Sequence, residues 1–67
     1  MKMDMITRNR MLDSIEDTLG PLDHRDVSKM TVIGLADRYY GPTEDGKKFN
    51  EDAMSRLEKV WAIQDAS

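Results

Sequence analysis

Hydrophobic residues recur at three- and four-residue spacing in three stretches of the chain, and this spacing predicts three amphipathic helices. The stretches cover residues 7–19, 23–40 and 50–65, with polar or turn-forming residues between them. Each helix needs a neighbour to cover its apolar stripe, so the pattern predicts an all-α fold, a small three-helix bundle. We expect residues 1–6 to be a flexible leader and residues 7–67 to be a single helical domain.

The third stretch carries the clearest helix signal. Asn50 has a side chain suited to cap a helix, and Phe49 and Met54 occupy the two positions of a hydrophobic staple around that cap. Two acidic residues follow Asn50, where the helix dipole favours negative charge. The apolar stripe consists of Ala53, Met54, Leu57, Val60, Trp61 and Ile63. Because Trp61 lies on this stripe, we interpret it as a core residue.

The first stretch has its own start and stop signals. Thr7 is placed to cap the helix, and the apolar stripe consists of Met11, Leu12, Ile15 and Leu19. Gly20 and Pro21 end the helix, because glycine takes the left-handed conformation past a helix end and proline cannot continue the helix.

The second stretch is apolar over a wide arc. Its apolar residues are Val27, Met30, Val32, Ile33, Leu35, Ala36, Tyr39 and Tyr40. A helix of this kind is usually central, packed on two sides or located at a subunit interface, so we favour a homodimer over a monomer. Gly34 in its middle costs about 1 kcal/mol against alanine. The benefit we expect in return is a close approach of a neighbouring helix to the backbone there.

The start and the type of this second element have alternatives. Asp23 with Asp26 resembles a capping pair, and a start at Asp26 or Ser28 is nearly as good. Residues 29–33 include three adjacent β-branched residues, which makes a strand the competing interpretation. We favour the helix, because a lone strand needs a partner and the chain offers few.

Residues 41–48 are the one clear loop in the sequence. A Gly-Pro pair closes the second helix, and a Glu-Asp-Gly run reads as a turn. The loop is long for a connection between two helices, which makes it a candidate for contacts with a partner. A phosphate-binding role is discounted, because the glycine spacing differs from that of a P-loop and no Ser or Thr follows Lys47.

Composition narrows the class of protein. The 67 residues leave room for one domain with a modest core, and the absence of cysteine excludes disulfides and thiolate metal sites. A net charge of −3 and a pI near 4.9 argue against nucleic acid and anionic membranes as partners. No secretory signal is visible, and the longest nearly apolar run, residues 30–36, is too short to span a bilayer. We expect a cytoplasmic protein of the producing or host cell, with no membrane contact.

Candidates for catalysis and metal binding are few. His24 is the only histidine, and together with Ser28 it sketches a base and a nucleophile. A domain of this size has little interior for a pocket or an oxyanion site, so we interpret His24 as an exposed residue of a first helical turn. An acidic cluster on the first helix is interpreted as a solvated face; it consists of Asp13, Glu16 and Asp17. We expect no enzymatic activity, no cofactor and no bound metal.

Nucleic-acid binding is the alternative function from a different class. The basic residues that would carry it stand near the N-terminus: Lys2, Arg8 and Arg10. The loop of residues 41–48 is too long for a helix-turn-helix, and the third helix has more acidic than basic side chains, which would repel phosphate. We therefore favour this function less.

Protein binding is the class that remains. Tyrosine and arginine often dominate interface energies, and two tyrosines and an arginine stand together at the end of the second helix. The expected protein interface consists of Arg38, Tyr39, Tyr40, Pro42, Lys47 and Lys48. Neighbours on a helix point about 100° apart, so at least one tyrosine points away from the core. In size and class the chain is similar to many bacterial and phage accessory proteins, which implies a module that binds and regulates or inhibits a larger protein.

Overall fold

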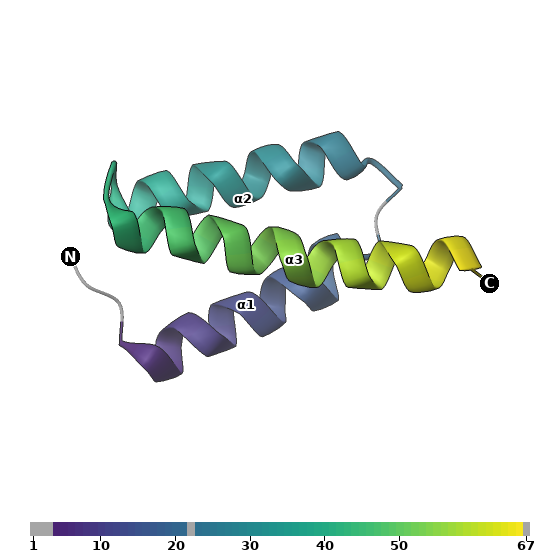
Figure 1. Ribbon diagram of the computed structural model, residues 1–67, viewed down its shortest axis with the longest axis horizontal. Coiled ribbons are helices and arrows are strands. Elements are labelled where there is room, and N and C mark those ends of the chain that lie inside the picture. The colour runs from purple at the N-terminus through teal and green to yellow at the C-terminus, as the bar shows by residue number, and fades with distance from the viewer. Residues whose placement is uncertain (1–3, 22, 67) are drawn as a thin grey trace.

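The computed structural model describes residues 4–21 and 23–66, and this part of the chain folds into three helices (Figure 1). They are α1 (Met5–Leu19), α2 (Arg25–Tyr40) and α3 (Glu44–Ala66). The predicted all-α three-helix bundle is confirmed. Residues 29–33 are helical, which excludes the competing strand.

The central helix is α3. In Figure 1 it runs between α1 and α2, and these two helices contact each other much less than each contacts α3. Every fourth residue along the middle of α3 is buried, namely Phe49, Ala53, Leu57 and Trp61. The other two helices cover this stripe with Leu12 and Ile15 from α1 and with Val32 and Ala36 from α2. Within one chain, α2 is therefore a peripheral helix, although its wide apolar arc suggested a central one.

The start of α1 differs from the prediction. The carboxylate of Asp4 caps the helix by accepting a hydrogen bond from the backbone N–H of Thr7 at 2.7 Å. This hydrogen bond lowers the pKa of Asp4. Thr7 as the cap is therefore wrong, and Met5 and Ile6, assigned to the leader, belong to the helix. The rest of the predicted leader, residues 1–3, lies outside the described residues.

The turn after α1 also differs in detail. The helix ends at Leu19 as predicted, but Gly20 keeps right-handed backbone angles (φ −57°, ψ −47°), so the left-handed stop is wrong. Position 20 requires a small residue, because a Cβ on Gly20 would lie 3.0 Å from a methyl group of Val60 on α3.

α2 begins at Arg25, two residues later than predicted. His24 stands at the cap position, and its side chain makes no capping hydrogen bond within the described residues. The proposed Asp23–Asp26 capping pair is therefore wrong. The helix ends at Tyr40, as predicted, and Gly41 follows with a positive φ of 64°, a conformation that glycine adopts readily.

The largest correction concerns α3, which starts six residues before the predicted start. The hydroxyl oxygen of Thr43 accepts a hydrogen bond from the backbone N–H of Gly46 at 3.1 Å, which makes Thr43 the cap. Asn50 as the cap and Phe49 as part of a staple are wrong, because both lie inside the helix. The expected loop of residues 41–48 shrinks to residues 41–43. Among the described residues, no helix is both long enough and apolar enough to cross a membrane.

Candidate functional site

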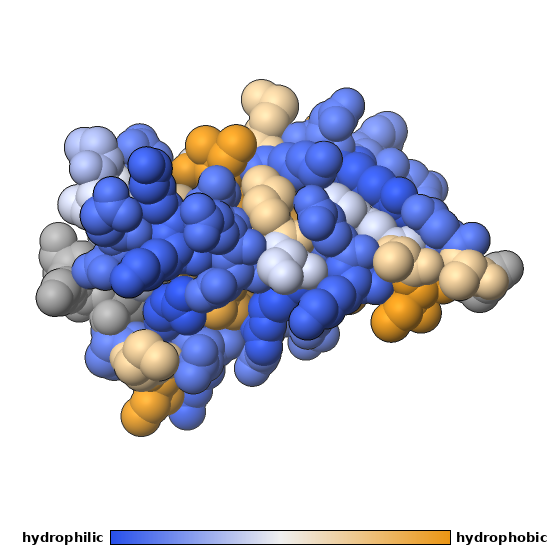
Figure 2. Space-filling view, viewed as in Figure 1, coloured by the Kyte–Doolittle hydropathy of each residue, from blue (hydrophilic) through white to orange (hydrophobic). Residues whose placement is uncertain are grey.

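The outer face of α2 exposes large apolar side chains. Val27, Met30 and Ile33 have exposed fractions of 54%, 71% and 53%. Figure 2 shows a largely hydrophilic surface on which apolar atoms come to the outside in a few places, one of them along the upper edge, where α2 lies. The wide apolar arc of the sequence thus consists of two faces, one buried against α3 and one uncovered within the chain.

Gly34 lies in this uncovered face. A Cβ added to it would meet no described atom within 4 Å. The close approach of a neighbouring helix that the sequence predicts at Gly34 is therefore absent within the described part of one chain.

A shallow groove of about 250 Å³ separates α1 from α2. It forms because both helices pack on α3 more than on one another. Its apolar lining consists of Met11, Ile15, Leu19 and Leu35, and its hydroxyl lining consists of Ser14, Thr18 and Thr31. The described residues that line it carry no charge. An apolar groove with short hydroxyl side chains suits the apolar face of another helix better than it suits a charged ligand.

The two adjacent tyrosines, Tyr39 and Tyr40, lie in different environments. Tyr40 is half-buried, packs beside the core and places its ring 5.4 Å from the ring of Phe49. Tyr39 is 37% exposed, and the guanidinium of Arg38 lies 5.7 Å from its ring centroid. One tyrosine is therefore largely structural, and the other is presented at the surface beside an arginine.

The rest of the expected interface lies at the same end of the molecule. Pro42 is exposed in the short connection, and Lys47 and Lys48 are exposed in the first turns of α3 rather than in a loop. The six residues are thus brought to one end of the bundle, where α2 gives way to α3 (Figure 1).

The arginines near the N-terminus do not form one patch. Arg8 is half-buried and makes an ion pair with Asp52 of α3, whereas Arg10 is exposed. Two residues apart, they point in nearly opposite directions around α1. Lys2 lies outside the described residues. A second ion pair, between Arg56 and Asp13 at 2.9 Å, joins the same two helices, so Asp13 belongs to a seam between helices rather than to a purely solvated face.

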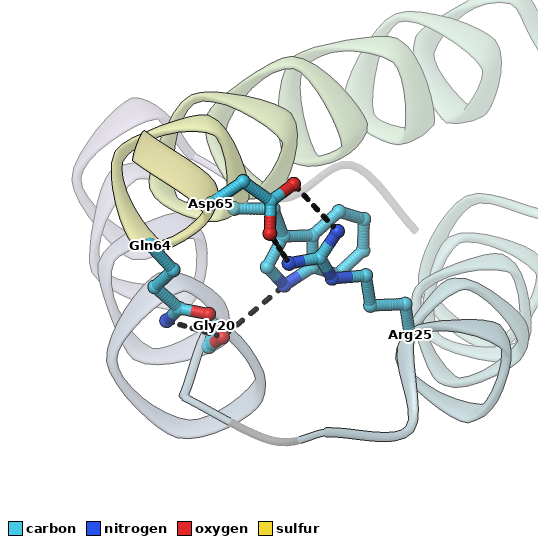
Figure 3. Close-up of polar contacts among 5 residues, drawn as sticks. Gly20, Arg25, Gln64 and Asp65 are labelled. Atoms are coloured by element: carbon cyan, nitrogen blue, oxygen red, sulfur yellow. Dashed lines mark hydrogen bonds and ion pairs between the residues drawn. The ribbon is translucent and has the colours of Figure 1, made fainter. Parts of the chain in front are cut away.

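The other end of the bundle holds a cluster of polar contacts that fastens the α1–α2 turn to α3 (Figure 3). The carbonyl oxygen of Gly20 accepts hydrogen bonds from Trp61 Nε1 at 3.1 Å and from Gln64 Nε2 at 3.0 Å. Arg25 donates two hydrogen bonds to the carboxylate of Asp65, at 2.6 and 3.0 Å. Trp61 is 4% exposed, so its interpretation as a core residue is confirmed.

The electrostatics of this cluster follow from the Arg25–Asp65 pair. The hydrogen bonds from the guanidinium lower the pKa of Asp65, and the same bonds raise the pKa of Arg25. The guanidinium carbon of Arg25 and the ammonium of Lys29 also lie 5.3 and 5.9 Å from the Trp61 ring centroid. Every strong polar group here is used to hold the helices together, so the cluster is structural.

Neither metal binding nor catalysis gains support from the side chains. No group of three or more His, Asp or Glu side chains able to hold a metal occurs in the described part of the chain. His24 is exposed directly before α2, and Ser28 is fully buried with its hydroxyl donating to the carbonyls of Leu19 and His24, at 3.2 and 3.3 Å. A buried hydroxyl engaged in this way stabilises the turn and is not placed to attack a substrate.

Two surface features were not predicted from the sequence. The groove depends on how α1 and α2 splay over α3, which no local pattern reveals. The outward position of Met30 and Ile33 follows from the helical phase of α2 once Val32 and Ala36 are known to face α3.

Comparisons with protein-family models, curated proteins and solved structures give no match for this chain. The surface of the chain itself is therefore the guide to its function.

Proposed function

We propose that this chain is a non-enzymatic protein-interaction module that binds a larger protein and thereby regulates or inhibits it. The observation that carries this proposal is the groove between α1 and α2, with its apolar and hydroxyl lining. Helices in contact with grooves of this kind bury apolar anchors spaced three and four residues apart. Regulation follows when the bound helix is one that the partner needs for its own activity.

The occupant we propose is an amphipathic helix of the partner. Arg10, Ser14 and Asp17 follow one another at four- and three-residue spacing along α1, so they share a stripe of this helix, and Ser14 in its middle lines the groove. The two charged residues are exposed and stand about two turns apart. A docked helix therefore fits best when its negative C-terminal end lies toward Arg10 and its positive N-terminal end lies toward Asp17.

Large charged substitutions at the mouth of the groove test this function. Ser14→Arg and Thr18→Arg change exposed residues of α1, so the fold should tolerate both while the groove is obstructed. Tagged protein is used to capture partners from a lysate of the source or host cell, and captured proteins are then tested pairwise with purified chain by calorimetry. We expect both variants to weaken binding of a direct partner by at least tenfold.

The matched control is Ser55→Arg, which places the same charge on an exposed position of α3, away from the groove. It should bind the partner as the unchanged protein does. Equal binding by all four proteins, or the failure of every captured protein to bind the purified chain directly, would contradict the proposed function.

A further inference from the structure

Four exposed residues form a single row on the outer face of α2. The row has a spacing of four residues and consists of Asp26, Met30, Gly34 and Arg38. Residues four apart lie next to one another on a helix surface and form one of the ridges through which two helices interdigitate when they pack. Val27 and Ile33, both more than half exposed, border this row on its two sides.

Gly34 is the first reason to expect another helix on this row. Glycine weakens the interior of a helix, and no described atom of the chain lies within 4 Å of the position a Cβ would take. Packing inside one chain therefore gives no reason for a glycine here. Beside exposed apolar residues such as Met30 and Ile33, a glycine permits the backbone of another helix to come close.

The order of the four residues is the second reason to expect another helix on this row, because the row is complementary to the same row running in the opposite direction. When the row is laid against a second copy that runs in the opposite direction, Asp26 meets Arg38 of the second copy. Met30, the most exposed of the large apolar residues on α2, meets the space above Gly34. A two-fold axis makes each of these contacts twice.

We propose that a second copy of this chain packs antiparallel on α2 through this row, so that the protein self-associates by a surface separate from the α1–α2 groove. Packing of i+4 ridges on both helices gives a crossing angle of about 50°. At this angle the two helix axes move apart sideways toward the ends of the contact. This sideways shift brings Arg38 over Asp26 of the second copy. Val27 and Ile33 then cover the sides of the contact.

The contact is smaller than the interfaces of stable dimers. A standard interface buries about 800 Å² on each partner, about a sixth of the 4888 Å² that this chain exposes. The outer face of one 16-residue helix supplies less than this area. We therefore expect a dimer with a dissociation constant of roughly 10–100 μM.

Charge exchange tests the proposal. Sedimentation equilibrium of the full chain from about 5 μM to about 1 mM covers the expected range. Asp26→Arg and Arg38→Asp each place like charges opposite one another at two symmetric positions, and each should raise the dissociation constant about tenfold. The double variant Asp26→Arg/Arg38→Asp exchanges the partners and should restore the dimer. Circular dichroism checks that all three variants remain helical.

A second variant keeps the proposal testable if a charge reversal disturbs folding. Gly34→Leu fills the space above the backbone, which is open within the described chain, so the monomer should stay folded while the dissociation constant rises at least a hundredfold. A wild type that stays monomeric at about 1 mM would overturn the proposal, and so would a dimer that tolerates both single reversals or is not restored by the double variant.

The groove variants separate this proposal from the proposed function. Thr18→Arg lies on α1 and should leave the dissociation constant of the dimer unchanged while it weakens binding of the partner protein. Loss of partner binding without loss of the dimer, or the reverse, shows which surface fails. A Thr18→Arg protein that no longer dimerises would place the self-association in the groove and overturn the assignment to the row.

Discussion

Two helices that both carry many apolar residues, α2 and α3, have opposite positions in this molecule. Phe49, Ala53 and Leu57 of α3 are fully buried, whereas Met30 and Ile33 of α2 are more than half exposed. The buried residues of α3 repeat every four positions in one direction, so a single stripe receives both α1 and α2. The apolar residues of α2 point in two directions, and only the direction of Val32 and Ala36 faces the bundle.

This difference shows that the amount of apolar surface on a helix does not determine its place in a bundle. The direction of the apolar residues does, because a helix that serves as the centre must present one continuous stripe to both neighbours. Apolar residues that remain after the bundle is complete are available for another chain. In this protein α3 supplies the central stripe of the core, and the outer face of α2 holds the apolar residues that the core leaves uncovered.

Removing one large apolar side chain from each helix tests whether α3 and α2 contribute so differently to stability. Leu57→Ala deletes a fully buried side chain at the centre of α3 and should cost about 2–5 kcal/mol through lost burial and the cavity left behind. A domain of this size holds only about 3–5 kcal/mol from its core, so the loss is comparable with the whole stability and a substantial fraction of the variant should be unfolded at 25 °C. Urea unfolding followed by circular dichroism measures the loss.

Met30→Ala is the counterpart on α2. Its side chain is 71% exposed, so the free energy of unfolding of the monomer should change by less than about 0.5 kcal/mol. Both variants are compared at a few micromolar, below the expected dimer dissociation constant. A loss from Met30→Ala as large as that from Leu57→Ala would show that the outer face of α2 is buried within one chain, contrary to the structure.

The two glycines inside helices, Gly46 of α3 and Gly34 of α2, should respond to alanine with changes of opposite sign in the free energy of unfolding. A Cβ on Gly46 of α3 would lie 2.9 Å from the carbonyl oxygen of Gly41 and 3.1 Å from Cβ of Tyr40, and both neighbours are held by the turn between the helices. Gly46→Ala should therefore destabilise the monomer by about 1–3 kcal/mol. Gly34→Ala meets open space and should stabilise it by up to about 1 kcal/mol through helix propensity.

Urea midpoints of the two glycine variants and the wild type measure the sign of both stability changes in one experiment. Stabilisation by Gly46→Ala would mean that the connection between α2 and α3 yields easily to the added methyl group. Destabilisation by Gly34→Ala at concentrations where the chain is monomeric would mean that Gly34 serves the fold of the single chain, and that a second chain is not needed to explain it.

The sequence predicts the number and type of the helices because helical periodicity is a local property. The start of α3 is a different case, since the cap predicted from the sequence is Asn50, next to the longer apolar stripe, whereas the cap in the structure is Thr43. The Glu-Asp-Gly run after Thr43 reads as a turn, yet the carboxylates suit a first helical turn. Gly46 is accepted there because Tyr40 and Gly41 leave no room for a side chain.

The candidate surfaces depend on relations between helices and are therefore harder to predict. At least one of Tyr39 and Tyr40 is predicted to point away from the core because neighbours on a helix lie about 100° apart, an argument that needs one helix only. The structure shows that the exposed one is Tyr39. The groove requires the splay of α1 and α2, and the contacts of Gly20 with Trp61 require residues 41 positions apart to meet. No local pattern contains that information.

The Arg25–Asp65 pair joins α2 to α3, and we expect its loss to have the smallest effect on stability. Because the pKa of Asp65 is lowered in the folded state, the pair stabilises the fold fully above the ordinary carboxyl pKa of 3.8. This contribution is lost as the pH falls through the lower pKa of the folded state, where the carboxylate becomes protonated. Urea midpoints of the wild type and Asp65→Asn should differ at about pH 6, and the difference should shrink as the pH falls below 3.8.

Arg25→Met tests the same pair from its other side. It also removes the cation beside the Trp61 ring, so it should lower the midpoint at every pH, including the pH at which Asp65 is protonated. Its pH dependence, however, should match that of Asp65→Asn, because both variants lack the ion pair that shifts the pKa of the carboxyl group. Curves for the wild type and both variants that run parallel from about pH 6 to pH values below 3.8 would show that this exposed pair does not join α2 to α3 energetically.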